Sequence, residues 1–231
     1  LLGSVALSVA AMARNPRWRF GALVAAGLAV AALAATFTRS SWLGFATSAT
    51  IVLAGARPRW LPAFLALLVA IAVFAPGEYR DRLYSVVDPH HPMNVERTHM
   101  WEAGVRMFRD HPITGVGLQD LHPIYDRYRS PDAREGAGHL HSVPIHIAAT
   151  MGILGLVAFA WLYGSMLWSG LAGLRASLRQ GDIEAGVRLG VTAGLAGFLV
   201  AGLFEWNFGD EELLYLLYTL VGLAWSARTW T

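Results

Sequence analysis

The chain has 231 residues, of which 55% are hydrophobic and only 15% are charged, with a formal net charge of +2. Soluble domains carry about 25% charged residues, so this composition argues against a soluble protein and for one that spans a lipid bilayer. The positive charges are dispersed arginines that form no nucleic-acid-binding patch, and the absence of cysteine excludes disulfides and thiolate metal sites.

Apolar segments recur along the chain at lengths that approach the roughly 20 residues needed to cross a bilayer as a helix. The predicted spans are residues 1–13, 20–37, 42–56, 60–75, 141–168, 187–204 and 213–225. The first begins inside an apolar run, without an initiator Met or a charged flank. We therefore expect a truncated first span and a chain that is a fragment of a longer protein.

This pattern predicts an all-α fold, a polytopic transmembrane helical bundle with a large helical extracytoplasmic (periplasmic) loop. Residues 1–75 and 141–231 form the transmembrane helices, and residues 76–140 form the loop. Short cytoplasmic loops carry an excess of positive charge. Arginines fall in alternate connections, at Arg14, Arg17, Arg19, Arg57, Arg59, Arg175, Arg179, Arg188 and Arg228. The long loop and the acidic connection 205–212 are on the other side, away from the cytoplasm.

Two helices are expected within the long loop. Residues 96–109 have an amphipathic pattern, with one face formed by Arg97, Trp101, Val105 and Phe108. Pro112 ends this helix, and the glycines that follow make a tight turn. A second helix is predicted at 119–128, with an apolar face of Leu121, Ile124, Tyr125 and Tyr128. Residues 130–138 form a connector.

Three side chains on the predicted outer side can carry chemistry. Arg39 lies at the junction of two spans, where an arginine either extends to the interface or binds a phosphate through its planar fork. Arg97 is either a stacked structural residue or a second phosphate ligand. Histidine titrates near neutral pH, so His141 suits a general base, although an interfacial histidine bonded to backbone fits the same position. Sequence position does not separate these alternatives.

A metal site is disfavoured although the chain contains eight histidines. His141 and His146 are five residues apart, which places them on different faces of a helix. No His-Glu-x-x-His motif is present. His139 and His141 can chelate from an extended segment, but the spacing reveals no third ligand. We predict no metal and no cofactor, and treat Glu205 and Asn207 as secondary binding candidates.

Several motifs, taken in order, resemble the O-antigen ligase and polymerase family. Residues 38–44 (Thr-Arg-Ser-Ser-Trp-Leu-Gly) are similar to its serine-arginine turn before a span. Arg97, Trp101 and Ala103, followed by 111–117 (His-Pro-Ile-Thr-Gly-Val-Gly), resemble its central signature. Residues 141–142 (His-Ser) and 151–156 (Met-Gly-Ile-Leu-Gly-Leu) resemble its His-Asn element, with Ser142 where Asn is usual and His146 where Gln is usual.

The resemblance implies a membrane glycosyltransferase that moves a glycan from undecaprenyl-pyrophosphate to an acceptor hydroxyl, most simply lipid A-core. A polymerase and a protein O-oligosaccharyltransferase are alternatives within the family. It implies a multi-pass protein of the bacterial cytoplasmic (inner) membrane that contacts membrane lipids and no nucleic acid. Family members have about twice as many spans, so the resemblance also implies that this chain is a C-terminal portion. The catalytic residues would be His141, Arg97 and Arg39. The substrate-binding residues would be Trp101, His139, Glu205 and Asn207.

Two other classes of protein fit a polytopic chain. A secondary transporter or lipid flippase shares the apolar helices with small residues. Such proteins place charged or broken elements near the membrane midplane, whereas these spans are nearly free of ionisable residues, which favours chemistry at the outer face. A noncatalytic assembly scaffold would tolerate loss of its outer Arg and His residues.

Overall fold

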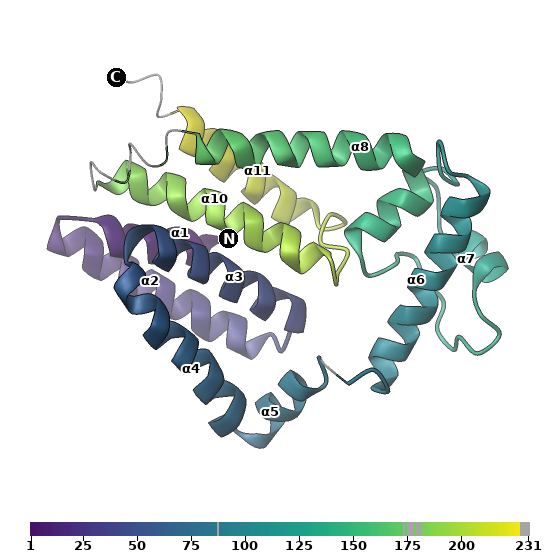
Figure 1. The fold of residues 1–231 in the computed structure, drawn as a ribbon, viewed down its shortest axis with the longest axis horizontal. Coiled ribbons are helices and arrows are strands. Elements are labelled where there is room, and N and C mark those ends of the chain that lie inside the picture. Colours follow the sequence, from purple (N-terminus) through teal and green to yellow (C-terminus); the bar gives the residue numbers. More distant parts are fainter. Residues whose placement is uncertain (87, 173, 175–177, 179–181, 227–231) are drawn as a thin grey trace. The chain divides into compact units, whose positions relative to one another are not determined.

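The protein is built from helices joined by loops. The computed structural model describes residues 1–231 except 87, 173, 175–177, 179–181 and 227–231, so Arg175, Arg179 and Arg228 lie outside the described residues. Within this part of the chain every regular element is a helix, which confirms the predicted all-α fold (Figure 1). The elements are α1 (Leu2–Met12), α2 (Pro16–Ala35), α3 (Arg39–Ala56), η1 (Pro58–Trp60), α4 (Leu61–Phe74), α5 (Gly77–Tyr84), α6 (Pro92–Asp110), α7 (His122–Tyr128), α8 (Val143–Leu171), α10 (Ile183–Gly202) and α11 (Glu211–Ser226).

Each predicted apolar segment lies in a helix, but not every helix is long enough to be a span. Among the described residues, α2, α8 and α10 are long and apolar enough to cross a membrane, and η1–α4 with α5 would add a fourth as one bent span. Helices α1, α4 and α11 have only 11, 14 and 16 residues. Fourteen residues rise about 21 Å, short of a hydrocarbon core of about 30 Å. Of the seven candidate spans, of which the first was expected to be truncated, the described residues therefore contain three, or four with the bent pair, that are long enough to cross a membrane.

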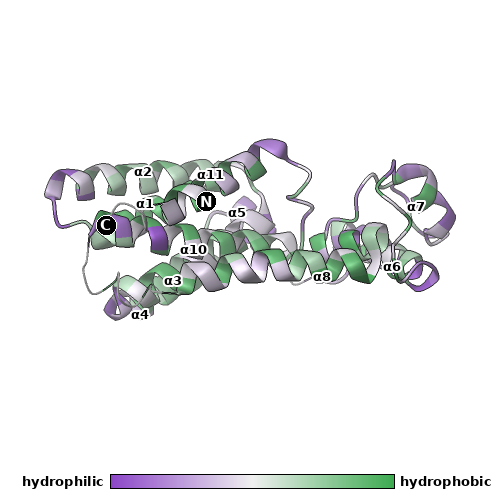
Figure 2. Ribbon diagram, turned by 90° about the horizontal axis from the view of Figure 1, so that it is seen from above, coloured by the Kyte–Doolittle hydropathy of each residue, from purple (hydrophilic) through white to green (hydrophobic). Residues whose placement is uncertain are grey.

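The chain divides into two compact units, and each is described by itself. Unit 1 comprises Leu1–Leu83, Met166–Ala201 and Asp210–Thr231, and unit 2 comprises Tyr84–Ser165 and Gly202–Gly209. Figure 2 shows apolar residues over much of α2, α3 and α10, and hydrophilic residues gathered on α7. Unit 1 therefore has the character of a membrane bundle. Unit 2 joins much of the predicted loop to the first part of α8 and to the segment after α10.

Small side chains allow the helices of unit 1 to approach closely. Helices α1, α2 and α3 lie side by side (Figure 1). The buried hydroxyls of Ser4 and Ser48 are hydrogen-bonded between α1 and α3, with an Oγ to Oγ distance of 2.8 Å. A Cβ on Gly44 would lie 2.6 Å from the carbonyl oxygen of Gly197 on α10. Because lipid tails are as apolar as the side chains, close packing and such polar contacts hold membrane helices together.

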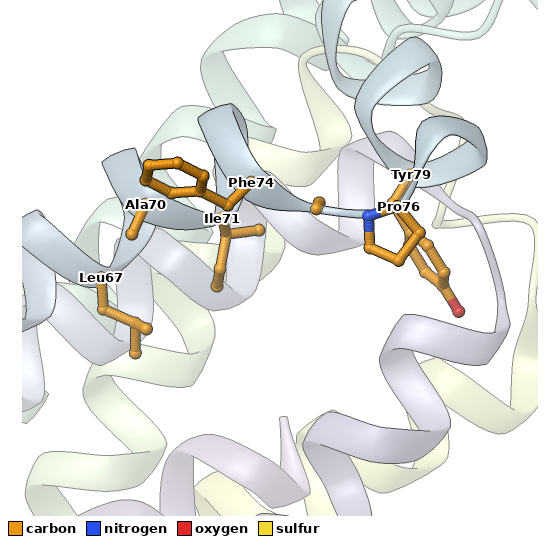
Figure 3. Close-up of a pocket in the computed structure, with 7 residues that line it drawn as sticks. Leu67, Ala70, Ile71, Phe74, Pro76 and Tyr79 are labelled. Carbon is orange, nitrogen blue, oxygen red and sulfur yellow. The ribbon is translucent and has the colours of Figure 1, made fainter.

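An apolar crevice of about 450 Å³ lies in unit 1, along α4 and its junction with α5 (Figure 3). The two helices of the bent pair meet at 107°. The lining is formed by Leu67, Ala70, Ile71, Phe74, Ala75, Pro76 and Tyr79. The ring of Tyr79 stacks on Phe37, with ring centroids 4.7 Å apart. Only Tyr79 among the lining residues bears a titratable group, so this crevice offers no catalytic chemistry.

Unit 2 has its own hydrophobic core between α6, α7 and the start of α8. Its fully buried members include Ala103 and Met107 of α6, Tyr125 of α7, and Leu140. Gly104 allows α6 to pack closely, because a Cβ there would lie 2.6 Å from the side chain of Ile145. This core face of α6 differs from the face that the sequence predicted for residues 96–109.

The predicted buried face is wrong for α6 and confirmed for α7. On α6 the buried residues are Met100, Ala103, Gly104 and Met107, whereas Val105 is 40% exposed. On α7 the predicted apolar face is confirmed, since Leu121, Ile124, Tyr125 and Tyr128 all join the core. Helix α7 begins later than predicted, at His122. The Asp120 carboxylate accepts a hydrogen bond from the His122 backbone N–H at 3.1 Å and turns the chain into the helix.

Helix α8 is broken at Gly152, and the glycine-rich loop after α6 fills the break. Gly152 has φ 63° and ψ −159°, a conformation that glycine adopts without a steric penalty. A Cβ on Gly152 would collide with the carbonyl oxygen of Ile113. Four backbone hydrogen bonds join the segments: Val116 N–H to Ala149 O, Gly117 N–H to Thr150 O, Ile153 N–H to Pro112 O and Leu154 N–H to Ile113 O. The loop thus satisfies backbone groups that the break releases.

Candidate functional site

The candidate site is built around the carboxylate of Glu205, which follows the end of α10. Its Oε1 lies 2.7 Å from Nδ1 of His141, and its Oε2 accepts a hydrogen bond of 3.0 Å from Nη2 of Arg97. The backbone N–H of Trp206 also donates to Oε1, at 3.0 Å. All four residues belong to unit 2. Two of the three predicted catalytic residues therefore meet on one carboxylate.

Glu205 is ionised at neutral pH. Burial raises the pKa of Glu205, but hydrogen bonds from His141 and the Trp206 backbone, with the charges of His141 and Arg97, lower it to about 2. These are hydrogen bonds to the charged form and nearby opposite charges, both of which favour ionisation. An ionised carboxylate accepts hydrogen bonds and donates none.

His141 is held in a backbone conformation that a side chain rarely adopts. Its φ is 45°, in the left-handed region, which costs about 1–2 kcal/mol for a residue other than glycine. Its neighbours Leu140 and Ser142 are buried, with 0% and 3% exposure, so the chain is anchored on both sides. The surrounding fold thus maintains local strain at the residue whose imidazole meets Glu205, as is common at functional positions.

Three further predicted site residues lie in the same unit. The ring of His139 packs against that of His141 with centroids 4.3 Å apart, and its Nε2 is 3.9 Å from Oε1 of Glu205. Trp101 follows Arg97 by one turn of α6, and its indole nitrogen is buried without a hydrogen-bond partner in the described part of the chain. Asn207 is buried, with its side chain beside Gly202.

Trp206 and His146 were not singled out as a pair from the sequence. Their rings are in tilted contact with centroids 3.8 Å apart, which packs the segment that carries Glu205 against the first turns of α8. The two residues are far apart in the chain, so no local spacing could have revealed the contact. The position of Glu205 directly after an apolar span, on the predicted outer side, was the available signal for its importance.

Arg39, the third predicted catalytic residue, belongs to unit 1. It is the first residue of α3 and is buried, with 9% exposure. The preceding turn contains Phe37 at φ 51°, whose carbonyl oxygen accepts a hydrogen bond of 3.1 Å from Nε of Arg82. An arginine buried at a helix start is more constrained than a side chain extended into solvent. A shared role for Arg39 with Arg97 and His141 stays a prediction.

The structure supplies the third potential metal ligand that spacing did not reveal. One ligand atom from each of His139, His141 and Glu205 lies within 4.8 Å of the others. Nitrogen and carboxylate ligands of this kind suit zinc-like ions. However, two ligands of a tetrahedral ion with bonds of about 2.0–2.1 Å are about 3.3 Å apart, whereas Nδ1 of His141 is 2.7 Å from Oε1 of Glu205. That distance favours a direct hydrogen bond.

The fold and the site together define a helical membrane protein with an Arg–Glu–His cluster in unit 2. The chain belongs to the O-antigen ligase family, whose model matches residues 24–160, more than half of its length. This confirms the resemblance seen in the sequence motifs. Members of the family are glycosyltransferase-like enzymes that use lipid-linked glycans. No match was found among curated proteins.

The matched region contains Arg39, Arg97 and His141 and ends before Glu205. The family match therefore covers the residues predicted to be catalytic but not the carboxylate that joins two of them. The contacts of Glu205 with Arg97 and His141 are seen only in the structure.

Proposed function

We propose that this protein transfers a glycan from an undecaprenyl-pyrophosphate carrier to an acceptor hydroxyl, with lipid A-core as the acceptor. The reaction would take place on the periplasmic face of the bacterial cytoplasmic membrane. The observation that carries the proposal is the meeting of Arg97 and His141 on Glu205, in a chain of the O-antigen ligase family. Family membership favours transfer over the transporter and scaffold alternatives.

Arg97 is suited to bind the carrier diphosphate. Glu205 is its one hydrogen-bonding partner among the described residues and engages one N–H of Nη2. A guanidinium has five N–H donors in a planar fork, so most of them stay available for phosphate oxygens. Fixed positive charge at a departing diphosphate stabilises the transition state. Arg39 would supply a second guanidinium, and neither requires a metal.

His141 is the proposed general base. The imidazole would accept the proton of the acceptor hydroxyl as its oxygen bonds to the anomeric carbon of the glycan. The bond from that carbon to the diphosphate oxygen breaks in the same step, and the undecaprenyl diphosphate leaves. A single displacement inverts the configuration at the anomeric carbon. Trp101, His139 and Asn207 would contact the substrates around this centre.

The acceptor is tested by the surface glycan of cells from which the gene is deleted. Loss of all capped lipid, with the full-length glycan left on its carrier, is the result expected for a ligase. Shortening of the glycan to one repeat would instead identify a polymerase, and an unchanged lipid ladder with loss of protein glycosylation would identify a protein transferase.

Transfer itself is tested with the intact protein in liposomes that contain the labelled lipid-linked donor and purified acceptor. We expect His141→Ala and Arg97→Ala each to lower turnover by about 100-fold or more. The matched controls are His90→Ala and Arg109→Ala, because both side chains are exposed and Arg109 lies on α6 with Arg97. Wild-type turnover by both site variants would refute the proposal. Translocation of the donor without transfer would identify a flippase.

A further inference from the structure

Glu205 occupies a central position for which a substrate-binding role does not account. Both of its oxygens are engaged by protein groups, Oε1 by His141 Nδ1 and the Trp206 N–H, and Oε2 by Arg97. These three hydrogen bonds use most of the roughly four acceptor sites of a carboxylate, so Glu205 mainly serves groups of the protein. The carboxylate instead connects the imidazole proposed as the base with the guanidinium proposed as the diphosphate ligand.

We propose that Glu205 is a positioning residue, which fixes the tautomer and orientation of His141 through Oε1 and the rotamer of Arg97 through Oε2. This inference rests on the proposed function. It replaces the substrate contact that the sequence suggested for Glu205, and it assigns a role to a residue outside the part of the chain matched by the family.

The tautomer follows from the chemistry of the bond. An ionised carboxylate can only accept, so the Nδ1 of His141 must be the donor across the 2.7 Å contact. In the neutral imidazole, the lone pair that accepts a proton is then on Nε2. Two other groups, the Trp206 backbone N–H and the Arg97 guanidinium, also favour the ionised form of Glu205. Without this partner, both tautomers of His141 would be populated.

The geometry also explains how one carboxylate can hold both His141 and Arg97. The Trp206 N–H adds a third hydrogen bond, and the ring contact between Trp206 and His146 holds the backbone from which the Glu205 side chain extends. The side chain of Glu205 is 28% exposed and that of Arg97 is 17% exposed. In such partly desolvated surroundings these charge-assisted bonds are stronger than in water.

The consequence for the reaction is a defined path for one proton. As the acceptor oxygen bonds to the anomeric carbon, its proton moves to Nε2 of His141, and the diphosphate leaves with the bonding electrons. Glu205 stabilises the imidazolium that forms and does not take the proton itself. Water then removes the proton from Nε2 when the product leaves.

The direct test is the imidazole tautomer of His141 in the wild-type protein. Two-bond ¹H–¹⁵N correlation spectra of ¹⁵N-histidine-labelled protein, with His141 assigned by His141→Gln, distinguish the two ring nitrogens. We expect a protonated Nδ1 and an unprotonated Nε2 at neutral pH. An Nε2–H tautomer would overturn the proposal. So would an Nδ1 that carries no proton because it is bound to a metal ion.

The second test is Glu205→Gln, which keeps the size of the side chain and removes its charge. Because an amide can donate to Nδ1, we expect the His141 tautomers to mix. We also expect kcat to fall by about 100-fold to 10,000-fold, with a smaller change in the donor KM. Glu211→Gln is the control, since Glu211 is an exposed carboxylate at the start of α11. An unchanged tautomer and wild-type kcat would overturn the positioning role.

The two proposals fail in different ways. If the wild-type protein transfers glycan and Glu205→Gln does so equally well, the positioning role is wrong and the proposed function stands. If the wild-type protein does not transfer glycan to any acceptor tested, the proposed function is wrong, whatever the spectra show.

Discussion

The two units of this protein hold their helices together by different means. In unit 1, small residues bring backbones into contact, as at Gly44 and Gly197 and at the buried Ser4–Ser48 hydrogen bond. In unit 2, a core of large side chains such as Met107 and Tyr125 supports a polar network centred on Glu205. The first arrangement suits a lipid environment, and the second resembles the interior of a water-soluble domain.

This difference predicts that substitutions in the two units have different effects, on stability in unit 1 and on catalysis at the site in unit 2. Substitutions at the helix contacts of unit 1 should affect folding and insertion and should leave the site chemistry unchanged in molecules that do fold. Substitutions at Arg97, His141 or Glu205 should abolish chemistry in protein that still folds. Gly115 of the loop after α6 and Gly152 of α8 are the exception, because both have positive φ and each packs against the backbone of the other segment, so their substitution should affect both. The predictions below test this division, from the largest expected effect to the smallest.

Gly152→Ala should have the largest effect on folding. A non-glycine residue at positive φ costs about 1–2 kcal/mol, and the collision of the new Cβ with the Ile113 carbonyl adds about 1–3 kcal/mol of overpacking. Gly164→Ala on the same helix is the control, because nothing lies within 4 Å of its Cβ position. The measurement is the yield and melting temperature of purified protein. Equal values for the two variants would contradict the interlock.

Gly44→Ala should destabilise unit 1 by about 1–3 kcal/mol. Its Cβ would lie 2.6 Å from the carbonyl oxygen of Gly197, so α3 and α10 must move apart. Gly27→Ala on α2 is the control, with an open Cβ position. The melting temperature should fall for the first variant alone. Turnover per folded molecule should be the same in both, and a selective loss of turnover by Gly44→Ala would break the division between the units.

Acid should weaken unit 2 through Glu205. The pKa of Glu205 falls from its ordinary value of 4.5 to about 2 in the folded protein. The stabilisation from its charge is therefore complete above pH 4.5 and is lost as the pH falls toward 2. Between these values the melting temperature of the wild type should fall more steeply than that of Glu205→Gln. Parallel curves would show that Glu205 gains nothing from its partners, and Glu211→Gln should follow the wild type.

Metal removal should have the smallest effect. If arginines supply the positive charge at the diphosphate, treatment with EDTA should leave turnover unchanged. Loss of activity that zinc restores would instead assign His139, His141 and Glu205 to a metal ion. That outcome would also remove the tautomer proposed for His141.

Hydrophobic pattern was sufficient to predict the fold class, and it placed each apolar segment in a helix. It also proposed candidate spans that are too short to cross a bilayer, because short helices such as α4 and α11 have the same apolar composition as longer ones. It also missed the break in α8, since an isolated Gly152 within an apolar run does not indicate a positive φ by itself. The motifs that resemble the family include both Gly115 and Gly152. Why glycine is needed at these positions became clear only from the backbone contacts between the loop after α6 and α8.

The site was predicted in part. Arg97 and His141 could be chosen because they are polar residues of suitable chemistry on the predicted outer side, and both meet Glu205. The role of Glu205 could not be derived, because its partners come from distant parts of the chain. The potential third metal ligand was missed for the same reason. Spacing identifies ligands that share a helix or strand, and these residues do not.

The central claim is that Arg97 and His141 act as one centre joined by Glu205. A double-mutant cycle on glycan transfer tests it most directly, with Arg97→Ala, His141→Ala and the double variant assayed in liposomes at equal amounts of folded protein. Residues that act as a unit give strongly non-additive losses. We predict that the double variant has about the same turnover as the less active of the two single variants. Losses that multiply, or a single variant with wild-type turnover, would contradict it.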